Sequence, residues 1–183
     1  MSQSYDALIR GAQVYDVNGA PPVSADVAIA GERIAAIGSL GSSTAKIDID
    51  ASGLALSPGF IDAHTHDDYA ALTHPDMGFK SRGGVTTCIV GNCGFGAAPY
   101  AQGVTMLGAL TPGGEIPEYV GHRGYADALE AVCPGVNIGV LAGHGTIRMA
   151  AMGTENRAPT ETEMAVMQAH LREALDAGVL GMS

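Results

Sequence analysis

Two histidines separated by one residue are the strongest chemical signal in the sequence. His64 and His66 follow the apolar stretch 54–56 and the pair Pro58-Gly59. In a strand, the side chains of residues i and i+2 point to the same side, so both imidazoles should face one way. Two such imidazoles form half of a zinc-type site. The alternative is a pair of solvated loop histidines, because short His pairs often occur without a metal.

A cysteine in a glycine-flanked turn is the second signal. Cys93 lies in the sequence Gly-Asn-Cys-Gly at 91–94, directly after the apolar run 84–90. A thiolate at the end of a strand suits a metal ligand or a nucleophile. The alternative is a buried structural cysteine, which fits Cys88 in the middle of the run better. Cys133, before a proline, has no evident role.

Other polar residues lie close to these positions. His144 follows the apolar run 136–142 and is a candidate for lining the site, although a lone histidine more often has a structural role. Asp62, Asp67 and Asp68 flank the histidine pair. Carboxylates that accept from a metal-bound imidazole fix its tautomer, so these three are candidates for that supporting role.

The second part of the chain reads as a series of strands and helices that would position these residues. The runs 85–90 and 136–142 are nearly continuous in apolar residues, and 179–180 begins a third. Such runs are typical of strands buried on both faces. Strands joined by helical crossovers form parallel sheets, and (β/α)8 barrels carry their sites at the carboxyl ends of the strands.

Two helices are predicted between these strands. Thr160 and Glu163 have the spacing of a capping box, apolar residues continue at helical spacing, and Gly178 provides the stop. A shorter helix is expected at 125–132. Together with the strands, these helices complete the alternating pattern of an α/β fold.

Residues 1–57 have a different character and read as a small β domain without a reactive cluster. Partial alternation of apolar residues favours an antiparallel sheet with one solvated face. Turn-forming residues separate the expected strands, which lie at 7–9, 12–15, 26–29, 33–37 and 46–50.

Length then limits the fold. A (β/α)8 barrel needs ~250 residues, and residues 58–183 supply about half of that. The sequence therefore predicts an α/β fold in which 58–183 is the first half of a TIM-type (β/α)8 barrel, truncated. Residues 1–57 are expected to be the N-terminal part of a small β-sandwich domain.

Composition excludes some classes of function. The net charge is −10 with only nine Lys and Arg residues, which argues against nucleic acid as a partner. No apolar run approaches the ~18–20 residues that span a bilayer, so no membrane association is expected. Three cysteines do not form a disulfide framework, and a cytoplasmic location is expected. No oligomeric state is predicted.

Several motifs resemble one known family. Residues 58–66 look like the first barrel strand of the amidohydrolase superfamily. Within it, Gly-Val-Thr-Thr at 84–87 followed by 91–94 resembles the N-acyl-D-amino-acid deacylases, or D-aminoacylases. The segments 143–148 and 178–183 are also similar to that family. The resemblance covers nearly the whole chain.

The resemblance implies a chemistry and a set of ligands. Cys93 would bind a tightly held zinc, and His64 and His66 would belong to a second, weaker metal site. The family takes further histidines and a proton-transferring aspartate from later strands, which we expect beyond the end of this chain. The implied reaction hydrolyses a small-molecule N-acyl-D-amino acid to a carboxylate and a free D-amino acid. The fragment alone is expected to be inactive.

Two other functions compete with this one. The first is a cyclic amidase of the hydantoinase or dihydroorotase kind, which bridges its metals with a carboxylated lysine on a later strand. Lys46 precedes the His pair and Lys80 lies ahead of the next strand, so neither has that position and Cys93 is the better bridging anion. The second is a non-catalytic, truncated chain that folds by pairing with another copy.

Overall fold

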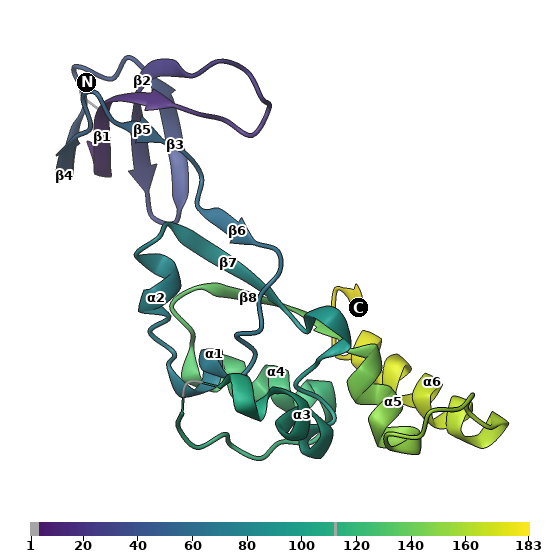
Figure 1. Ribbon diagram of the computed structural model, residues 1–183. Helices are drawn as coiled ribbons and strands as arrows, with labels where there is room; N and C mark the ends of the chain where they lie inside the picture. The colour runs from purple at the N-terminus through teal and green to yellow at the C-terminus, as the bar shows by residue number, and fades with distance from the viewer. Residues whose placement is uncertain (1–3, 112) are drawn as a thin grey trace. The chain divides into compact units, whose positions relative to one another are not determined.

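The computed structural model describes residues 4–111 and 113–183, which form two compact units (Figure 1). The first unit ends at Pro58 and the second begins at Gly59. Each unit has a sheet of its own. No helix in the described residues is long and apolar enough to cross a membrane.

The first unit contains a sheet of mixed strand direction. Its strands are β1 (Ser4–Val14), β2 (Val23–Ala30), β3 (Arg33–Gly38), β4 (Thr44–Asp50) and β5 (Ala55–Leu56). The order is β3-β2-β1-β4, and β5 also pairs with β1. β1 is antiparallel to β2 but parallel to β4 and β5. The expected antiparallel sheet is therefore confirmed for β1, β2 and β3 and wrong for β4 and β5, because alternation indicates a buried face and not the direction of the neighbouring strand.

Gly11 does not divide β1 into the two strands that the sequence predicts. Its φ is +67°, and the pairing with β2 shifts register between Ile9 and Ala12. Its N–H donates to Asp26 Oδ1 at 2.9 Å. The strand accommodates the glycine as a local irregularity and continues beyond it.

Burial in the first unit is uneven. Tyr5, Leu8 and Ala28 form its core. Four isoleucines of β3 and β4 are exposed, namely Ile34, Ile37, Ile47 and Ile49. The residues of this unit contribute nothing to the metal-ligand groups among the described residues.

The second unit is built on a parallel sheet, as the sequence predicts. Its strands are β6 (Phe60–Asp62), β7 (Val85–Val90), β8 (Asn137–Ala142) and β9 (Gly181–Met182), in the order β6-β7-β8-β9. All neighbouring pairs are parallel. The backbone N–H of Leu180 donates to Val140 O at 2.8 Å, just before β9 begins to pair with β8. β9 therefore directly follows the apolar residues 179–180 that predicted this strand.

Helices connect these strands and cover one side of the sheet (Figure 1). They are α1 (Ala70–Thr73), α2 (Gly78–Ser81), α3 (Tyr100–Leu107), α4 (Gly121–Val132), α5 (His144–Met152) and α6 (Glu161–Asp176), with 3-10 turns η1 (Asn92–Gly94) and η2 (Gly108–Leu110). Tyr69, Met77, Cys88 and Tyr125 are buried between the sheet and the helices. Cys88 thus occupies the core position that its place in the sequence predicts.

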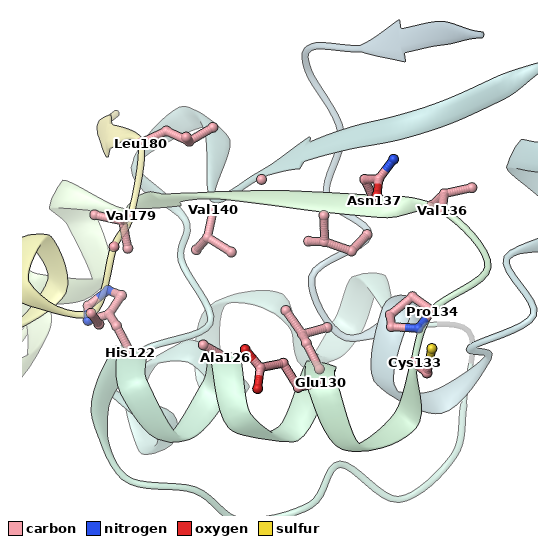
Figure 2. Close-up of a pocket in the computed structure, with 15 residues that line it drawn as sticks. His122, Ala126, Glu130, Cys133, Pro134, Val136, Asn137, Val140, Val179 and Leu180 are labelled. Atoms are coloured by element: carbon pink, nitrogen blue, oxygen red, sulfur yellow. The ribbon is translucent and has the colours of Figure 1, made fainter. Parts of the chain in front are cut away.

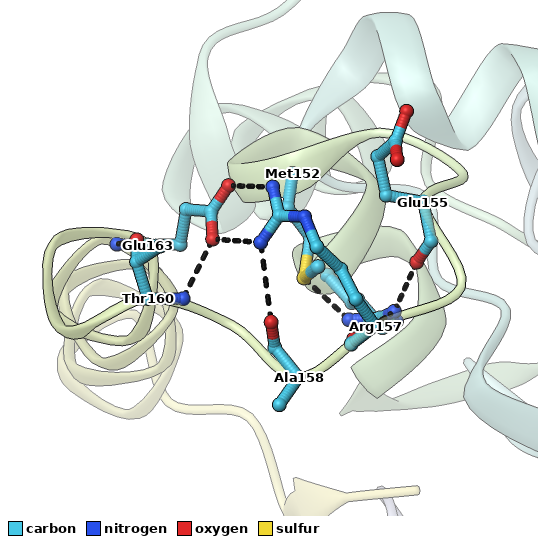
Figure 3. A network of polar contacts seen from close by, with 7 residues as sticks. Met152, Glu155, Arg157, Ala158, Thr160 and Glu163 are labelled. Carbon is cyan, nitrogen blue, oxygen red and sulfur yellow. Dashed lines mark hydrogen bonds and ion pairs between the residues drawn. The ribbon is translucent and has the colours of Figure 1, made fainter.

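The capping box of α6 is confirmed. Thr160 Oγ1 accepts from Glu163 N at 3.2 Å, and Glu163 Oε2 accepts from Thr160 N at 2.7 Å (Figure 3). Arg157 adds an ion pair to Glu163 at 2.7 Å. Arg157 and the cap of Thr160 lower the pKa of Glu163 to about 2.

Helix α4 begins four residues before the predicted start at Tyr125. Glu173 of α6 accepts hydrogen bonds from the backbone N–H groups of His122 and Arg123, at 2.9 and 3.2 Å. Its other oxygen lies 2.8 Å from His122 Nδ1. The helix start is capped by a residue distant in the sequence, so local sequence signals could not reveal it.

Candidate metal centre

His64, His66 and Cys93 converge at the carboxyl ends of the neighbouring strands β6 and β7. One ligand atom from each lies within 4.8 Å of the others. His64 Nε2 and Cys93 Sγ are 3.1 Å apart. The two imidazole rings lie edge to face, with centroids 5.9 Å apart. The structure thus brings together the three residues that the sequence proposed as metal ligands.

The two histidines do not lie on a strand. β6 ends at Asp62. His64 and His66 belong to what we call the histidine loop (residues 62–68), which begins with that last strand residue. The backbone N–H of His64 donates to Asp62 Oδ1 at 3.2 Å, a short-range bond typical of aspartate at a turn. The two side chains converge with Cys93, as expected. The reason given for it, alternation along a strand, was wrong, because the histidines lie after the strand.

Cys93 is held in an unusual backbone conformation. It lies in the cysteine loop (residues 91–96), and its φ of +57° is uncommon for a residue with a side chain. Asn92 Nδ2 donates to Ile89 O at 2.7 Å and thereby ties the loop to β7. At Gly91, a Cβ would lie 2.1 Å from Leu141 O, so only glycine fits there.

The cysteine loop packs backbone against backbone on the start of α5. A Cβ at Gly143 would lie 2.4 Å from Gly96 N, and one at Gly145 would lie 2.9 Å from Gly94 O. These approaches explain why glycines recur at both places. They also place the cysteine thiol within reach of the histidine loop.

Two hydroxyl groups bind the backbone of the cysteine loop. Thr146, which is fully buried, accepts from Gly96 N at 2.8 Å and donates to Gly96 O at 3.1 Å. Ser183 accepts from Gly94 N at 3.1 Å and donates to Gly91 O. Sequence reasoning missed both residues, although they lie in the segments that resemble the family.

Two of the three predicted aspartates bind a lysine. Lys80 Nζ lies 2.7 Å from Asp62 Oδ2 and 2.8 Å from Asp67 Oδ2. The hydrogen bond from Lys80 lowers the pKa of Asp62. Burial alone would lower the pKa of Lys80, but the hydrogen bonds to both carboxylates raise it. Asp62 and Asp67 also form a donor group with Cys88; the ammonium already compensates its charge, so we do not assign a metal there.

Asp68 lies apart from that lysine. It is fully buried, and neither carboxylate oxygen has a hydrogen-bond partner of normal geometry among the described residues. Burial raises the pKa of Asp68 to about 7, an effect that the nearby backbone N–H groups of Asp68 and Gly91 partly offset. In the described chain, none of the three aspartates forms a hydrogen bond to an imidazole ring of the pair, so their role in orienting the imidazoles stays a prediction.

The donor set and one orphaned atom fit a zinc ion. His66 Nδ1 is buried and has no hydrogen-bond partner in the described part of the chain. Buried polar atoms normally have one, and a metal ion would serve as that partner. Two imidazoles and one thiolate are typical zinc ligands. His144 is exposed at the first position of α5, at the carboxyl end of β8, and lies outside the three-residue group.

A cavity of about 490 Å³ lies elsewhere, between α4 and β8 (Figure 2). His122 and Glu130 line it from α4, Cys133 lines it from the position just after that helix, and Asn137 and Val140 line it from β8. None of the three converging ligands borders this cavity. It lies on the helix-covered side of the sheet and is not part of the candidate metal centre.

The chain is similar in sequence to curated deacylases. The N-acyl-D-glutamate deacylase of Alcaligenes xylosoxydans xylosoxydans is 40% identical over 183 residues, and the D-aminoacylase of the same organism is 41% identical over 184. Each match covers 100% of this chain and 38% of the relative. The chain thus spans well under half the length of these curated relatives.

Solved structures agree with this result. The N-acyl-D-glutamate deacylase from Bordetella bronchiseptica, complexed with zinc and a phosphonate inhibitor, is 40% identical with a TM-score of 0.85. A D-aminoacylase described as having a binuclear metal centre is 42% identical with a TM-score of 0.89. The matches cover 98% and 97% of this chain, respectively, and 38% of each solved chain. This likeness confirms the expected fold, the first half of a TIM-type barrel with part of a small β domain.

The family follows from a match that covers most of the chain. Residues 49–183 match the amidohydrolase family, a range that includes every strand of the parallel sheet and all three converging side chains. The chain belongs to the amidohydrolase family.

Proposed function

We propose that this chain carries the first metal ligands of a zinc-dependent deacylase. The reaction is hydrolysis of the N-acyl amide of an N-acyl-D-amino acid to a carboxylate and a free D-amino acid. The observation that carries the proposal is the convergence of His64, His66 and Cys93 within 4.8 Å. Relatives named as N-acyl-D-glutamate deacylase and D-aminoacylase support the choice of substrate class.

Each ligand has a distinct part in the proposal. Cys93 provides an anionic sulfur for the tight zinc site, and His64 and His66 provide neutral imidazole nitrogens for a second, weaker site. Bound zinc supplies Lewis-acid polarisation of the amide carbonyl and a lowered pKa for an attacking water. His144, exposed at the end of β8, lines the approach to the ligands.

The structure of a solved relative supports a site with more than one metal. The D-aminoacylase with the binuclear centre is described as activated by one metal and attenuated by the second. Two metals with different effects on activity agree with our proposal of one tight site at Cys93 and one weaker site at the two histidines. A small-molecule substrate remains the expected partner.

Two cysteine variants test the metal assignment. Cys93 is exposed beside the histidines, whereas Cys88 is fully buried in the core. We expect Cys93→Ala to lose tight zinc and keep its fold, because an anionic ligand is removed. Cys88→Ala should keep its zinc and lose about 1–2 kcal/mol of unfolding free energy. Zinc content by atomic absorption and a thermal melt distinguish the two; full zinc in Cys93→Ala would remove that residue from the site.

The reaction is tested with enantiomers. The zinc-loaded protein in its natural full length should release the amino acid from N-acetyl-D-methionine or N-acetyl-D-glutamate and leave the L-enantiomers intact. Turnover of a cyclic diamide such as hydantoin, without turnover of either acylated D-amino acid, would favour the cyclic amidase instead.

A further inference from the structure

We propose that Lys80 is a positioning residue of the metal centre. Its ammonium group holds the histidine loop in the shape that directs His64 and His66 toward Cys93. The inference rests on the proposed function, because it requires these histidines to bind a metal. It extends that function to a residue that does not touch the metal or the substrate.

The ammonium of Lys80 contacts three oxygen atoms of one short segment. It donates to Asp62 Oδ2 at 2.7 Å and to Thr65 Oγ1 at 3.1 Å, and lies 2.8 Å from Asp67 Oδ2. An ammonium has three donors. All three acceptors come from the histidine loop, so a single side chain ties that loop at three points.

The tied residues alternate with the proposed ligands. His64 lies between Asp62 and Thr65, and His66 lies between Thr65 and Asp67. The loop is thus fixed on both sides of each histidine. Thr65 Oγ1 also donates to Asp67, and His64 N donates to Asp62. Movement of the ammonium would therefore move both imidazoles.

Lys80 is itself attached to the rigid part of the unit. Its backbone N donates to Met77 O at 2.9 Å. Met77 is fully buried in the core, and the Lys80 side chain is only 18% exposed. The lysine thus connects the packed core to the loop that carries the ligands.

Loss of the ammonium would leave two carboxylates close together. The side chains of Asp62 and Asp67 are 28% and 19% exposed, so water screens them only in part. Their repulsion would spread the loop and turn the imidazoles away from Cys93. Removal of a residue that orients metal ligands without touching the metal typically lowers metal affinity by about 10- to 100-fold.

The chain offers a matched control, because it has one other lysine. Lys46 forms an ion pair of 2.7 Å with Asp6, but this pair is largely exposed and lies in the first unit. Zinc affinity of the whole chain is measured by competition with a chromophoric chelator. At the weaker site of His64 and His66, we expect Lys80→Met to bind zinc about 10- to 100-fold more weakly and Lys80→Arg to regain part of the affinity. Lys46→Met should match the unchanged chain.

A second readout distinguishes positioning from a general loss of stability. The visible spectrum of bound Co²⁺ reports ligand geometry, so Lys80→Met should alter it at saturating metal. Should Lys80→Met fail to fold by thermal melt, Asp62→Asn replaces it, since that change removes one tie and leaves the lysine in place. Unchanged affinity and spectrum in these variants would overturn the inference.

A double substitution tests the route of the effect. When His64 and His66 are both replaced by Ala, Lys80→Met should no longer change the remaining zinc affinity, because its effect passes through the histidines. An equal loss in that background would overturn the inference and leave the metal site itself standing. Absence of zinc binding by the unchanged protein in its natural full length would overturn the proposed function, and the role of Lys80 with it.

Discussion

The histidine loop and the cysteine loop meet at one site but are held by different forces. The ammonium of Lys80 binds two partly buried carboxylates of the histidine loop. Uncharged interactions hold the cysteine loop. Its glycines contact the backbone at the start of α5, and the hydroxyl groups of Thr146 and Ser183 form hydrogen bonds with its backbone. The histidine loop therefore depends on charge balance, whereas the cysteine loop depends on glycines without side chains and on uncharged hydroxyl groups.

This difference predicts how each loop tolerates substitution. An ion pair can be restored by another side chain of the same charge and similar length. Its loss changes the conformation of a loop but introduces no steric clash. Contacts between glycine backbones have no such substitute, because even one methyl group meets backbone atoms that cannot move aside. We expect the cysteine loop to be the less tolerant of the two.

The largest effect is expected from a methyl group at the glycine contact. Gly143 has a φ that any residue adopts, so Gly143→Ala tests space alone. The added Cβ would lie 2.4 Å from Gly96 N and 2.7 Å from Gly94 O. Overpacking of this kind costs about 1–3 kcal/mol, and we expect about 3 kcal/mol of unfolding free energy to be lost in a urea titration.

A glycine in open space provides the control for that test. A methyl group added at Gly41 would have no atom within 4 Å beyond its chain neighbours, and the φ of Gly41 lies outside the left-handed region. Gly41→Ala should therefore leave the urea midpoint nearly unchanged. Equal stability of Gly143→Ala and the unchanged chain would show that the two loops do not differ in the way described.

A smaller effect is expected when a neutral tie is removed without a change of shape. Thr146→Val keeps the volume of the side chain and leaves Gly96 N–H without its buried acceptor. An unsatisfied buried donor costs about 1–3 kcal/mol, and we expect about 2 kcal/mol in the same titration. Thr146→Ser keeps the hydroxyl and should retain more of the stability than Thr146→Val. Equal stability of the Val and Ser variants would contradict a role for this hydroxyl.

The sequence predicted the parts of the site that depend on local pattern. Apolar runs followed by Cys93 and His144 placed both residues at the carboxyl ends of parallel strands. Thr160 and Glu163 correctly predicted the start of α6. These signals work because strand burial and helix capping involve neighbours in the sequence.

The parts that could not be predicted depend on distant contacts. Lys80 meets Asp62 across 18 residues, and Ser183 meets Gly94 across 89. Nothing in the local pattern of either segment indicates its partner. The parallel pairing of β1 with β4 escaped prediction for the same reason, since strand direction depends on where the chain returns.

The smallest effect is expected from a charged network that is separate from both loops. Arg157 and the cap of Thr160 lower the pKa of Glu163 from 4.5 to about 2 at the start of α6. A carboxylate with a lowered folded pKa stabilises the fold above its unfolded pKa, and this contribution is lost as the pH falls through the folded value. The stability difference between the unchanged chain and Glu163→Gln should therefore be constant above about pH 5 and shrink between about pH 4.5 and 2. Thermal melts across this range measure the difference, and zinc affinity at neutral pH should be the same for both proteins.

A loss of zinc affinity in Glu163→Gln would mean that a distant charge also changes the metal site. The contrast between the two loops would then not depend on their direct interactions alone.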